Sequence, residues 1–291
     1  MGVFVVKCLS RIPLWLSYRT LGPLLYVLIF YVFRYRVKVA SDNIARAFPE
    51  QTEKQHKQLL KQYYHYLAEM FCEVLHSPRL SVDELKKRMH FKNPEVVNDL
   101  HAQGKPVILV ALHQCNWEWL LNSGCVSLDP QVEVIYKPLH NKAFDEYFKK
   151  SRSKFNPILI PHKRAIADFA HRRDAFFLAL LADQAPLKKR QKAWTTMFDR
   201  DTAFPLGVDF FAKKSDAVVV FANPVRVARG HYEVEIEVIA EPPYDDSFYI
   251  IEQYAKRGEA AIRNQPETWL WSNRRWSYRK ADDPTLGDVS Q

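Results

Sequence analysis

Short apolar runs alternate with segments of helical periodicity along most of the chain. Apolar residues recur at helical spacing between runs of strand length. We predict strands at residues 106–112, 132–138, 157–161, 175–183, 217–227 and 231–241. The last two form a hairpin-like pair around Gly230. This alternation indicates an α/β fold: a central mixed, largely parallel sheet flanked by helices.

Helices are expected between and around these strands. Residues 41–78 read as helical, with a cap at Ser41 or Asp42 and a break at Pro49. Residues 82–105 suggest a helix, a short strand and a second helix. Further helices are predicted at residues 119–128, 142–155, 164–174 and 247–271. Residues 39–280 then form one catalytic domain, and residues 281–291 a loose tail.

The N-terminal segment, residues 1–38, has a different pattern. From Val3 to Phe33 it is mostly apolar and aromatic, and a basic cluster follows it. Its longest uncharged stretch, Thr20–Phe33, is shorter than the roughly 20 residues of a spanning helix. We expect a membrane-associated helical segment, which is either a marginal spanning anchor or a helical pair lying in the interface.

Charge and cysteine content narrow the partners. The formal net charge is +9, with 42 basic and 33 acidic residues, so the chain suits an anionic partner. Cys8, Cys72, Cys115 and Cys125 form no metal-binding spacing, and we read them as reduced thiols. No nucleic-acid-binding motif is present. No metal or cofactor is expected.

His113 and Glu118 are the candidate catalytic pair. The apolar run 107–112 delivers His113 at its end, and Glu118 follows five positions later. Five residues span about 140° around one helix, so the pair meets only if His113 lies in a turn before the helix. Asn116 is a suitable N-cap for that helix. One imidazole nitrogen would then face the substrate while Glu118 orients the other. The plain alternative is a surface histidine beside an unrelated glutamate.

Other polar residues follow neighbouring strands. Asp183 and Gln184 come after the strand at 175–183, near the same rim as His113. Asp183 either pairs with a basic residue, positions the substrate or simply ends the strand. Lys137 and Arg152 follow the second strand and are candidates for binding a phosphate. These four residues are the predicted substrate-binding set.

Several ordered blocks resemble one family. The segment "ALHQCNWEWL" (111–120) resembles the His-x4-Asp/Glu block of the lysophospholipid acyltransferase superfamily, and more narrowly that of the lipid A late acyltransferases. The blocks "NIARAFPE" (43–50), "VIYKPLHN" (134–141), "LLADQAP" (180–186), "FDRDTAFPLG" (198–207) and "QPETWLWSNRRWS" (265–277) agree in order and spacing. Lys137 replaces a frequent arginine, and Asn273 a common histidine.

The resemblance implies an O-acyltransferase. The donor would be an acyl carrier protein thioester with a saturated chain of 12 to 14 carbons. The acceptor would be a glycolipid such as a lipid A precursor, or alternatively a lysophospholipid or ornithine lipid. The reaction would occur at the cytoplasmic face of the inner membrane, against anionic lipid.

Two other classes are weighed. A thioesterase or lipase would use Cys115 or a serine, but no Gly-x-Ser-x-Gly elbow occurs. A non-catalytic binding protein would leave His113 and Glu118 unexplained.

Two basic clusters fit either a surface or a structural role. Lys188, Lys189, Arg190 and Lys192 form a solvated loop or a patch for lipid headgroups or the carrier protein. Arg274 and Arg275 lie among Trp269, Trp271 and Trp276, which suits a membrane interface or core packing with a salt bridge.

Overall fold

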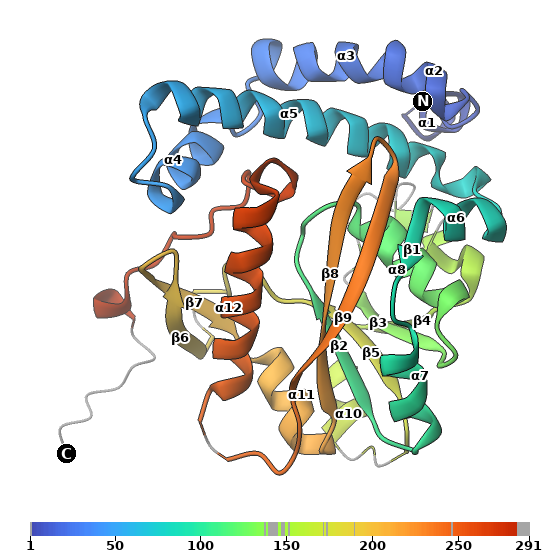
Figure 1. The fold of residues 1–291 in the computed structure, drawn as a ribbon, viewed down its shortest axis with the longest axis vertical. Coiled ribbons are helices and arrows are strands. Elements are labelled where there is room, and N and C mark those ends of the chain that lie inside the picture. Colours follow the sequence, from blue (N-terminus) through green and yellow to red (C-terminus); the bar gives the residue numbers. More distant parts are fainter. Residues whose placement is uncertain are drawn as a thin grey trace.

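A seven-stranded sheet lies at the centre of the molecule (Figure 1). The computed structural model describes residues 2–136, 138, 145–146, 149–150, 152–170, 172, 174–188, 190–245 and 247–283. In the order of the sheet, its strands are β1 (Met89–Phe91), β9 (His231–Ala240), β8 (Val218–Ala228), β2 (Val107–Ala111), β5 (Phe177–Leu181), β3 (Val132–Tyr136) and β4 (Ile158–Pro161). Neighbours pair in parallel except β8 with β9. The predicted mixed, largely parallel sheet is confirmed.

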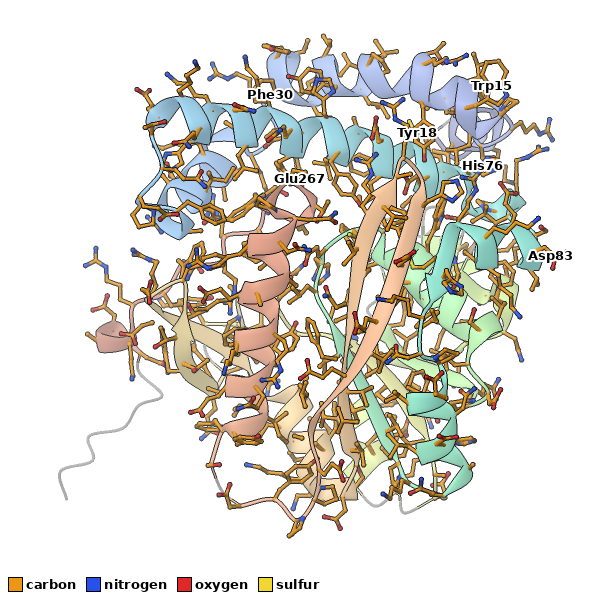
Figure 2. All side chains as sticks on the ribbon, in the orientation of Figure 1. Trp15, Tyr18, Phe30, His76, Asp83 and Glu267 are labelled. Carbon is orange, nitrogen blue, oxygen red and sulfur yellow. The ribbon has the colours of Figure 1, made fainter. Side chains whose placement is uncertain are left out.

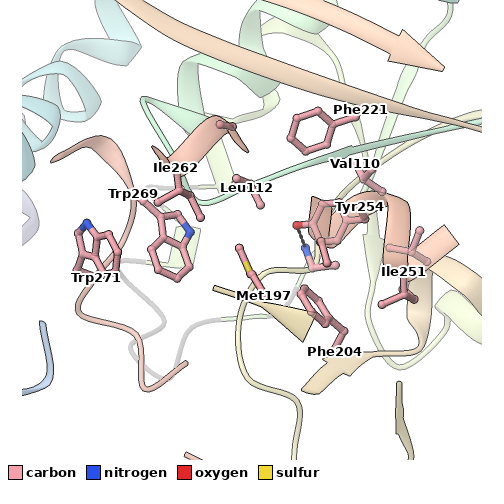
Figure 3. Packing of buried hydrophobic residues seen from close by; sticks show 14 of the residues in the cluster. Val110, Leu112, Met197, Phe204, Phe221, Ile251, Tyr254, Ile262, Trp269 and Trp271 are labelled. Carbon is pink, nitrogen blue, oxygen red and sulfur yellow. Dashed lines mark hydrogen bonds between the residues drawn. The ribbon is translucent and has the colours of Figure 1, made fainter. Parts of the chain in front are cut away.

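The central strand β2 is buried on both faces, which explains its unbroken apolar run. Ile108 and Val110 pack with helices α10 (Ala165–Ala170), α11 (Gly207–Ser215) and α12 (Tyr249–Asn264). Leu109 and Ala111 pack with α7 (Glu95–Ala102) and α8 (Trp117–Ser127). Helices therefore cover both faces of the sheet, because successive side chains of a strand point to opposite sides. Figure 3 shows the cluster on the α12 side around Val110, Leu112 and Tyr254.

Residues 2–76 fold into helices that we call the N-terminal layer. They are α1 (Gly2–Leu9), α2 (Leu14–Arg19), α3 (Leu21–Tyr26), the π-helix η1 (Val27–Val32), α4 (Val37–Ala47) and α5 (Glu53–His76). The layer crosses the tip of the β8–β9 hairpin, at one end of the sheet (Figure 1). Helix α5 begins with a capping box between Thr52 and Gln55. Helix α4 begins before the predicted Ser41, after Arg36 in the left-handed conformation.

Large apolar side chains are exposed on this layer. No helix among the described residues has the length and apolar character needed to cross a membrane. Figure 2 shows Trp15 at the outer edge of the layer. The exposed side chains include Trp15, Leu24, Val27, Tyr31, Val32, Phe33 and Tyr35. Exposed apolar side chains grouped in this way are typical of a surface that contacts a membrane or another protein.

A second, two-stranded sheet consists of β6 (Lys192–Met197) and β7 (Arg200–Pro205), which pair antiparallel. No element is predicted there from the sequence. The two residues of its turn, Phe198 and Asp199, have φ values of 55° and 52°. Such a turn normally carries Asn-Gly or Asp-Gly, so the usual hairpin signal is missing.

Shorter elements complete the chain. They are α6 (Val82–Arg88) and the 3-10 helices η2 (Ser77–Arg79), η3 (Ser153–Phe155), η4 (Pro266–Thr268) and η5 (Lys280–Asp282). The C-terminal helix predicted at 247–271 ends at Asn264, before Pro266. Of the helix predicted at 142–155, residues 142–144, 147–148 and 151 lie outside the described residues, and the described remainder is helical and ends in η3.

Candidate active site

His113 and Asp183 face each other at the carboxyl ends of two neighbouring strands. Strands β2 and β5 pair in parallel with Ala111 opposite Leu181. Two residues further along each strand, His113 lies opposite Asp183. The His113 Nδ1 atom is 2.6 Å from Asp183 Oδ1, and the His113 backbone N–H donates to Asp183 Oδ2 at 2.9 Å. The parallel register therefore creates the histidine–carboxylate pair.

Asp183 is held as a carboxylate. It is buried and accepts a third hydrogen bond, from Trp269 Nε1 at 2.8 Å. Burial alone would raise its pKa, but the charge of His113 and the three hydrogen bonds together lower the pKa below the usual value of 3.8. A carboxylate at Nδ1 keeps the proton on that nitrogen, so Nε2 carries the lone pair.

The Nε2 atom of His113 already has a polar neighbour. The side-chain nitrogen of Gln184 lies 3.1 Å from it. With the proton on Nδ1, the Gln184 amide is the donor and the imidazole the acceptor. A hydroxyl that displaced this amide would meet the same lone pair.

The partner predicted for His113 is corrected by the structure. Glu118 lies in the first turn of α8 and binds Arg152, with distances of 2.5 Å to Nη2 and 2.8 Å to Nε. This bidentate hydrogen bond with Glu118 raises the pKa of Arg152. Asp183 makes the orienting contact instead, because strand register brings it directly to Nδ1, whereas Glu118 faces Arg152.

The turn after His113 is fixed from several directions. Gln114 donates to the Ala261 carbonyl at 3.0 Å, and the Cys115 N–H donates to the Thr268 carbonyl at 3.0 Å. Cys115 adopts φ of 54°, a left-handed conformation that costs energy for a residue with a side chain. Asn116 caps α8 by accepting the Trp119 N–H at 3.0 Å, as predicted.

The Cys115 thiol is unsuited to nucleophilic attack. It is fully buried and donates to the Pro224 carbonyl at 3.2 Å. Burial raises the pKa of Cys115 to about 12, so the thiolate is scarce at neutral pH. The structure gives no support to Cys115 as a nucleophile.

A cavity of 440 Å³ opens beside His113. Strands β3 and β5 pair only from Val132–Phe177 to Val134–Ala179 and separate toward their carboxyl ends. The lining extends from His113, beyond the carboxyl end of β2, to Val132 and Phe177, at the amino ends of β3 and β5. Among the described residues, its ionisable side chains are His113, Glu118, Tyr136 and Arg152, and the remainder of the lining is almost wholly apolar. The cavity can therefore hold a long apolar group with its polar end beside His113.

The predicted substrate-binding residues have different outcomes. Asp183 and Gln184 contact His113, and Arg152 lines the cavity through its pair with Glu118. Lys137 lies outside the described residues. No cluster of His, Cys, Asp and Glu that could hold a metal ion occurs in the described part of the chain.

The two basic clusters each contain buried and exposed residues. Trp269, Trp271 and Arg275 are buried, so of the two alternatives the structure supports core packing for them and not the membrane interface. Arg275 packs against the Phe204 ring at 4.2 Å, and Arg274 is exposed. Lys192 forms a buried salt bridge with Asp283 at 2.7 Å. Lys188 and Arg190 are exposed, while Lys189 lies outside the described residues.

Two residues that support the pair were not predicted in this role from the sequence. Trp269 donates to Asp183, and Tyr254 donates to the Ala111 carbonyl at 2.8 Å while accepting the Ala182 N–H at 3.3 Å. Tyr254 therefore bridges the ends of both strands that carry the pair. Apolar periodicity marks such residues only as core, so no local signal distinguished them.

Comparison with known proteins identifies relatives along the whole chain. A family model described as "Bacterial lipid A biosynthesis acyltransferase" matches residues 1–278. A lipid A biosynthesis acyltransferase of Haemophilus influenzae is 24% identical over 279 residues, covering 93% of this chain and 85% of the relative. A lipid A biosynthesis lauroyltransferase of Escherichia coli is 21% identical over 290 residues, covering 98% and 93%.

Proposed function

Because the chain belongs to the bacterial lipid A biosynthesis acyltransferase family and is thus an acyltransferase, we propose a specific reaction for it. It moves a fatty acyl chain from an acyl carrier protein thioester to a hydroxyl of a glycolipid such as a lipid A precursor. One observation carries the proposal: His113, with its Nδ1 on Asp183, borders an apolar cavity. That cavity suits an acyl chain, and Nε2 suits a base.

The chemistry requires one base and no covalent intermediate. The acceptor hydroxyl replaces the Gln184 amide at Nε2 of His113 and gives its proton to that nitrogen. Its oxygen attacks the thioester carbonyl, so a C–O bond forms and the C–S bond breaks. The thiolate leaves and takes the proton back from Nε2. The Asp183 carboxylate stabilises the imidazolium between these two steps.

The cavity accounts for a preference among acyl chains. Each buried CH₂ contributes about 0.8 kcal/mol, so a long chain gains most of its binding energy there. The lining follows β5 from Phe177 to Leu181, a distance of about 13 Å along the strand. A cavity of fixed depth favours one chain length, and we propose a saturated chain of 12 to 14 carbons, as in the family it resembles.

Arg152 and Glu118 sit at the polar end of the same cavity. We assign Arg152 to a phosphate on the acceptor or on the phosphopantetheine arm, as the sequence predicts for it and for Lys137. Glu118 holds the guanidinium in place through the bidentate contact. The role of Glu118 is therefore indirect, because Glu118 acts on the substrate through Arg152.

The N-terminal layer supports attachment to the cytoplasmic face of the inner membrane. Trp15 and Phe33 are 60% and 72% exposed, and Arg19 lies 5.5 Å from the centre of the Trp15 ring. Exposed aromatic rings beside arginines suit the headgroup depth of a bilayer, and the net charge of +9 favours anionic lipid. We propose that this layer lies in the interface.

Lipid analysis of a deletion strain tests the reaction. Loss of one acyl chain from the glycolipid should be restored by the wild-type gene and not by His113→Ala. His90→Ala is the matched control, because His90 is exposed on β1 and is not among the cavity-lining residues. An unchanged glycolipid in the deletion strain, with an altered phospholipid or ornithine lipid, would move the proposal to another acceptor.

A further inference from the structure

A buried carboxylate outside the proposed reaction lies between the N-terminal layer and the catalytic turn. Glu73 of α5 is fully buried and forms no salt bridge with the described residues. Burial raises its pKa despite the hydrogen bonds it accepts. A buried carboxyl group without a salt bridge is costly unless hydrogen bonds compensate it.

Three donors from three separate elements converge on Glu73. Tyr18 of α2 donates to Oε1 at 2.7 Å. Asn116 donates to Oε2 at 2.8 Å, and Tyr232 of β9 donates to the same oxygen at 2.7 Å. The carboxylate therefore joins the first helices of the chain, the β8–β9 hairpin and the turn that carries His113.

The Asn116 side chain makes two hydrogen bonds, one that caps α8 and one to Glu73. The Asn116 carbonyl oxygen caps α8, and the amide nitrogen binds Glu73. Only one orientation of the amide satisfies both partners. Glu73 thus fixes the side chain of Asn116, which caps α8. Asn116 lies three residues after His113 and next to Cys115, which has a left-handed conformation.

The Tyr18 hydroxyl that donates to Glu73 lies next to the tip of the β8–β9 hairpin. Gly230 has φ of 67°, and a Cβ at that position would clash with the Tyr18 hydroxyl. Figure 2 shows Tyr18 directed from the N-terminal layer toward this tip. The Tyr18 ring passes next to Gly230 to reach Glu73. The position of α2 therefore affects a hydrogen bond to the buried carboxylate.

We propose that Glu73 is a positioning residue that couples the seating of helix α2 to the geometry of the His113 turn. The inference rests on the proposed acyl transfer and adds a link from the lipid-facing layer to the base. The ionisable groups around Glu73 are Tyr18, Tyr66, Glu69, Cys72, Arg88, Cys115, Arg226 and Tyr232.

An exchange of carboxylate and amide tests the link between Glu73 and Asn116. Asn116→Asp keeps a good N-cap but sets two buried carboxylates against each other. We expect kcat to fall at least about tenfold at pH 8, with less loss at pH 6, where the pair shares a proton. Adding Glu73→Gln restores an amide donor to the pair. The double variant should return to within about threefold of wild type and lose the new pH dependence.

A tyrosine pair tests the link to the N-terminal layer. Tyr18→Phe removes one donor to Glu73 and should lower kcat severalfold while the KM for the acyl donor is unchanged. Tyr64→Phe is the matched control, because the Tyr64 hydroxyl donates to the Tyr35 carbonyl at 2.5 Å within the same layer and does not contact Glu73. It should leave kcat unchanged.

Amide hydrogen exchange of the peptide 114–121 in the full-length protein gives a readout independent of acyl transfer. Exchange should quicken in Tyr18→Phe and Asn116→Asp, stay normal in Tyr64→Phe, and recover in Asn116→Asp/Glu73→Gln. If wild type shows no acyl transfer, the proposed function fails while the exchange pattern still judges the coupling. Absence of rescue in the double variant, or equal effects of Tyr18→Phe and Tyr64→Phe, overturns the coupling.

Discussion

Replacing Asp183 with asparagine should disable the base while leaving the fold intact. The Asp183 Oδ2 atom accepts two N–H groups, from the His113 backbone and from Trp269, and within the described part of the chain Oδ1 accepts only the His113 Nδ1 proton. The asparagine side chain would keep two bonds by placing its carbonyl oxygen at the Oδ2 position. Its NH₂ group then faces Nδ1, which must become an acceptor, so the imidazole proton moves to Nε2.

The loss follows from that tautomer. With its proton on Nε2, His113 has no lone pair for the acceptor hydroxyl. The same change in a serine protease triad lowers kcat about 10⁴-fold, and we expect a loss of about 10³- to 10⁴-fold here. The melting temperature should change little, because two of the three hydrogen bonds survive.

The assay combines kinetics with nitrogen-15 NMR of the His113 ring in wild type and Asp183→Asn. Asp209→Asn is the control, since Asp209 is a largely buried carboxylate paired with Lys213 and is not among the residues that line the cavity. Near-normal kcat in Asp183→Asn, or an unchanged tautomer with a large loss, would refute the reasoning.

The same variant has a pH signature in stability. The pKa of Asp183 is lowered in the folded state, so its carboxylate stabilises the fold above the unfolded value near 3.8. That contribution disappears as pH falls through the lower folded pKa. The unfolding free energy of wild type should therefore fall more steeply below pH 4 than that of Asp183→Asn.

Four further predictions concern other parts of the chain. Cys115→Ser should keep most of the activity, because a serine hydroxyl can replace the buried thiol as donor to the Pro224 carbonyl; a trapped acyl group on Cys115, found by mass spectrometry, would contradict this. Glu118→Ala should lower kcat/KM by about 10- to 100-fold through loss of the Arg152 contact, and equal kinetics to wild type would remove Glu118 from the site. Gly124→Val should shift the preferred acyl donor to a shorter chain, since Gly124 lines the cavity near Val132 and Leu128; an unchanged profile over donors of 8 to 18 carbons would deny that the cavity holds the chain. Trp15→Ala with Phe33→Ala should weaken binding to anionic vesicles in sedimentation assays, leaving a salt-sensitive remainder, and undiminished binding in 1 M salt would place the contact elsewhere.

The order of strands and helices was predictable because burial leaves a periodic pattern. Strand β2 is buried on both faces, and both β2 and β5 form continuous apolar runs in the sequence. The β6–β7 hairpin was missed, since Phe198 and Asp199 adopt left-handed conformations without the glycine that usually marks such a turn. Tertiary contacts in the β6–β7 region override the local preference.

The site was predictable in its residues but not in its pairing. His113, Asp183 and Gln184 were expected at one rim, since parallel strands end together. The partner of His113 depends on register, which places Ala111 opposite Leu181, and sequence spacing alone favoured Glu118. Glu73 and Trp269 contribute through contacts across 43 and 86 positions of the chain. Such contacts leave no mark in a local window.

The most direct test of the central claim is single-turnover acyl transfer with the purified full-length protein. Acyl carrier protein loaded with a 12- or 14-carbon chain is mixed with a lipid A precursor, and the product is measured by mass spectrometry. We predict a mass increase of one acyl group with wild type and His90→Ala, and none with His113→Ala. Transfer by His113→Ala at the wild-type rate, or hydrolysis of the thioester without transfer, would contradict the account.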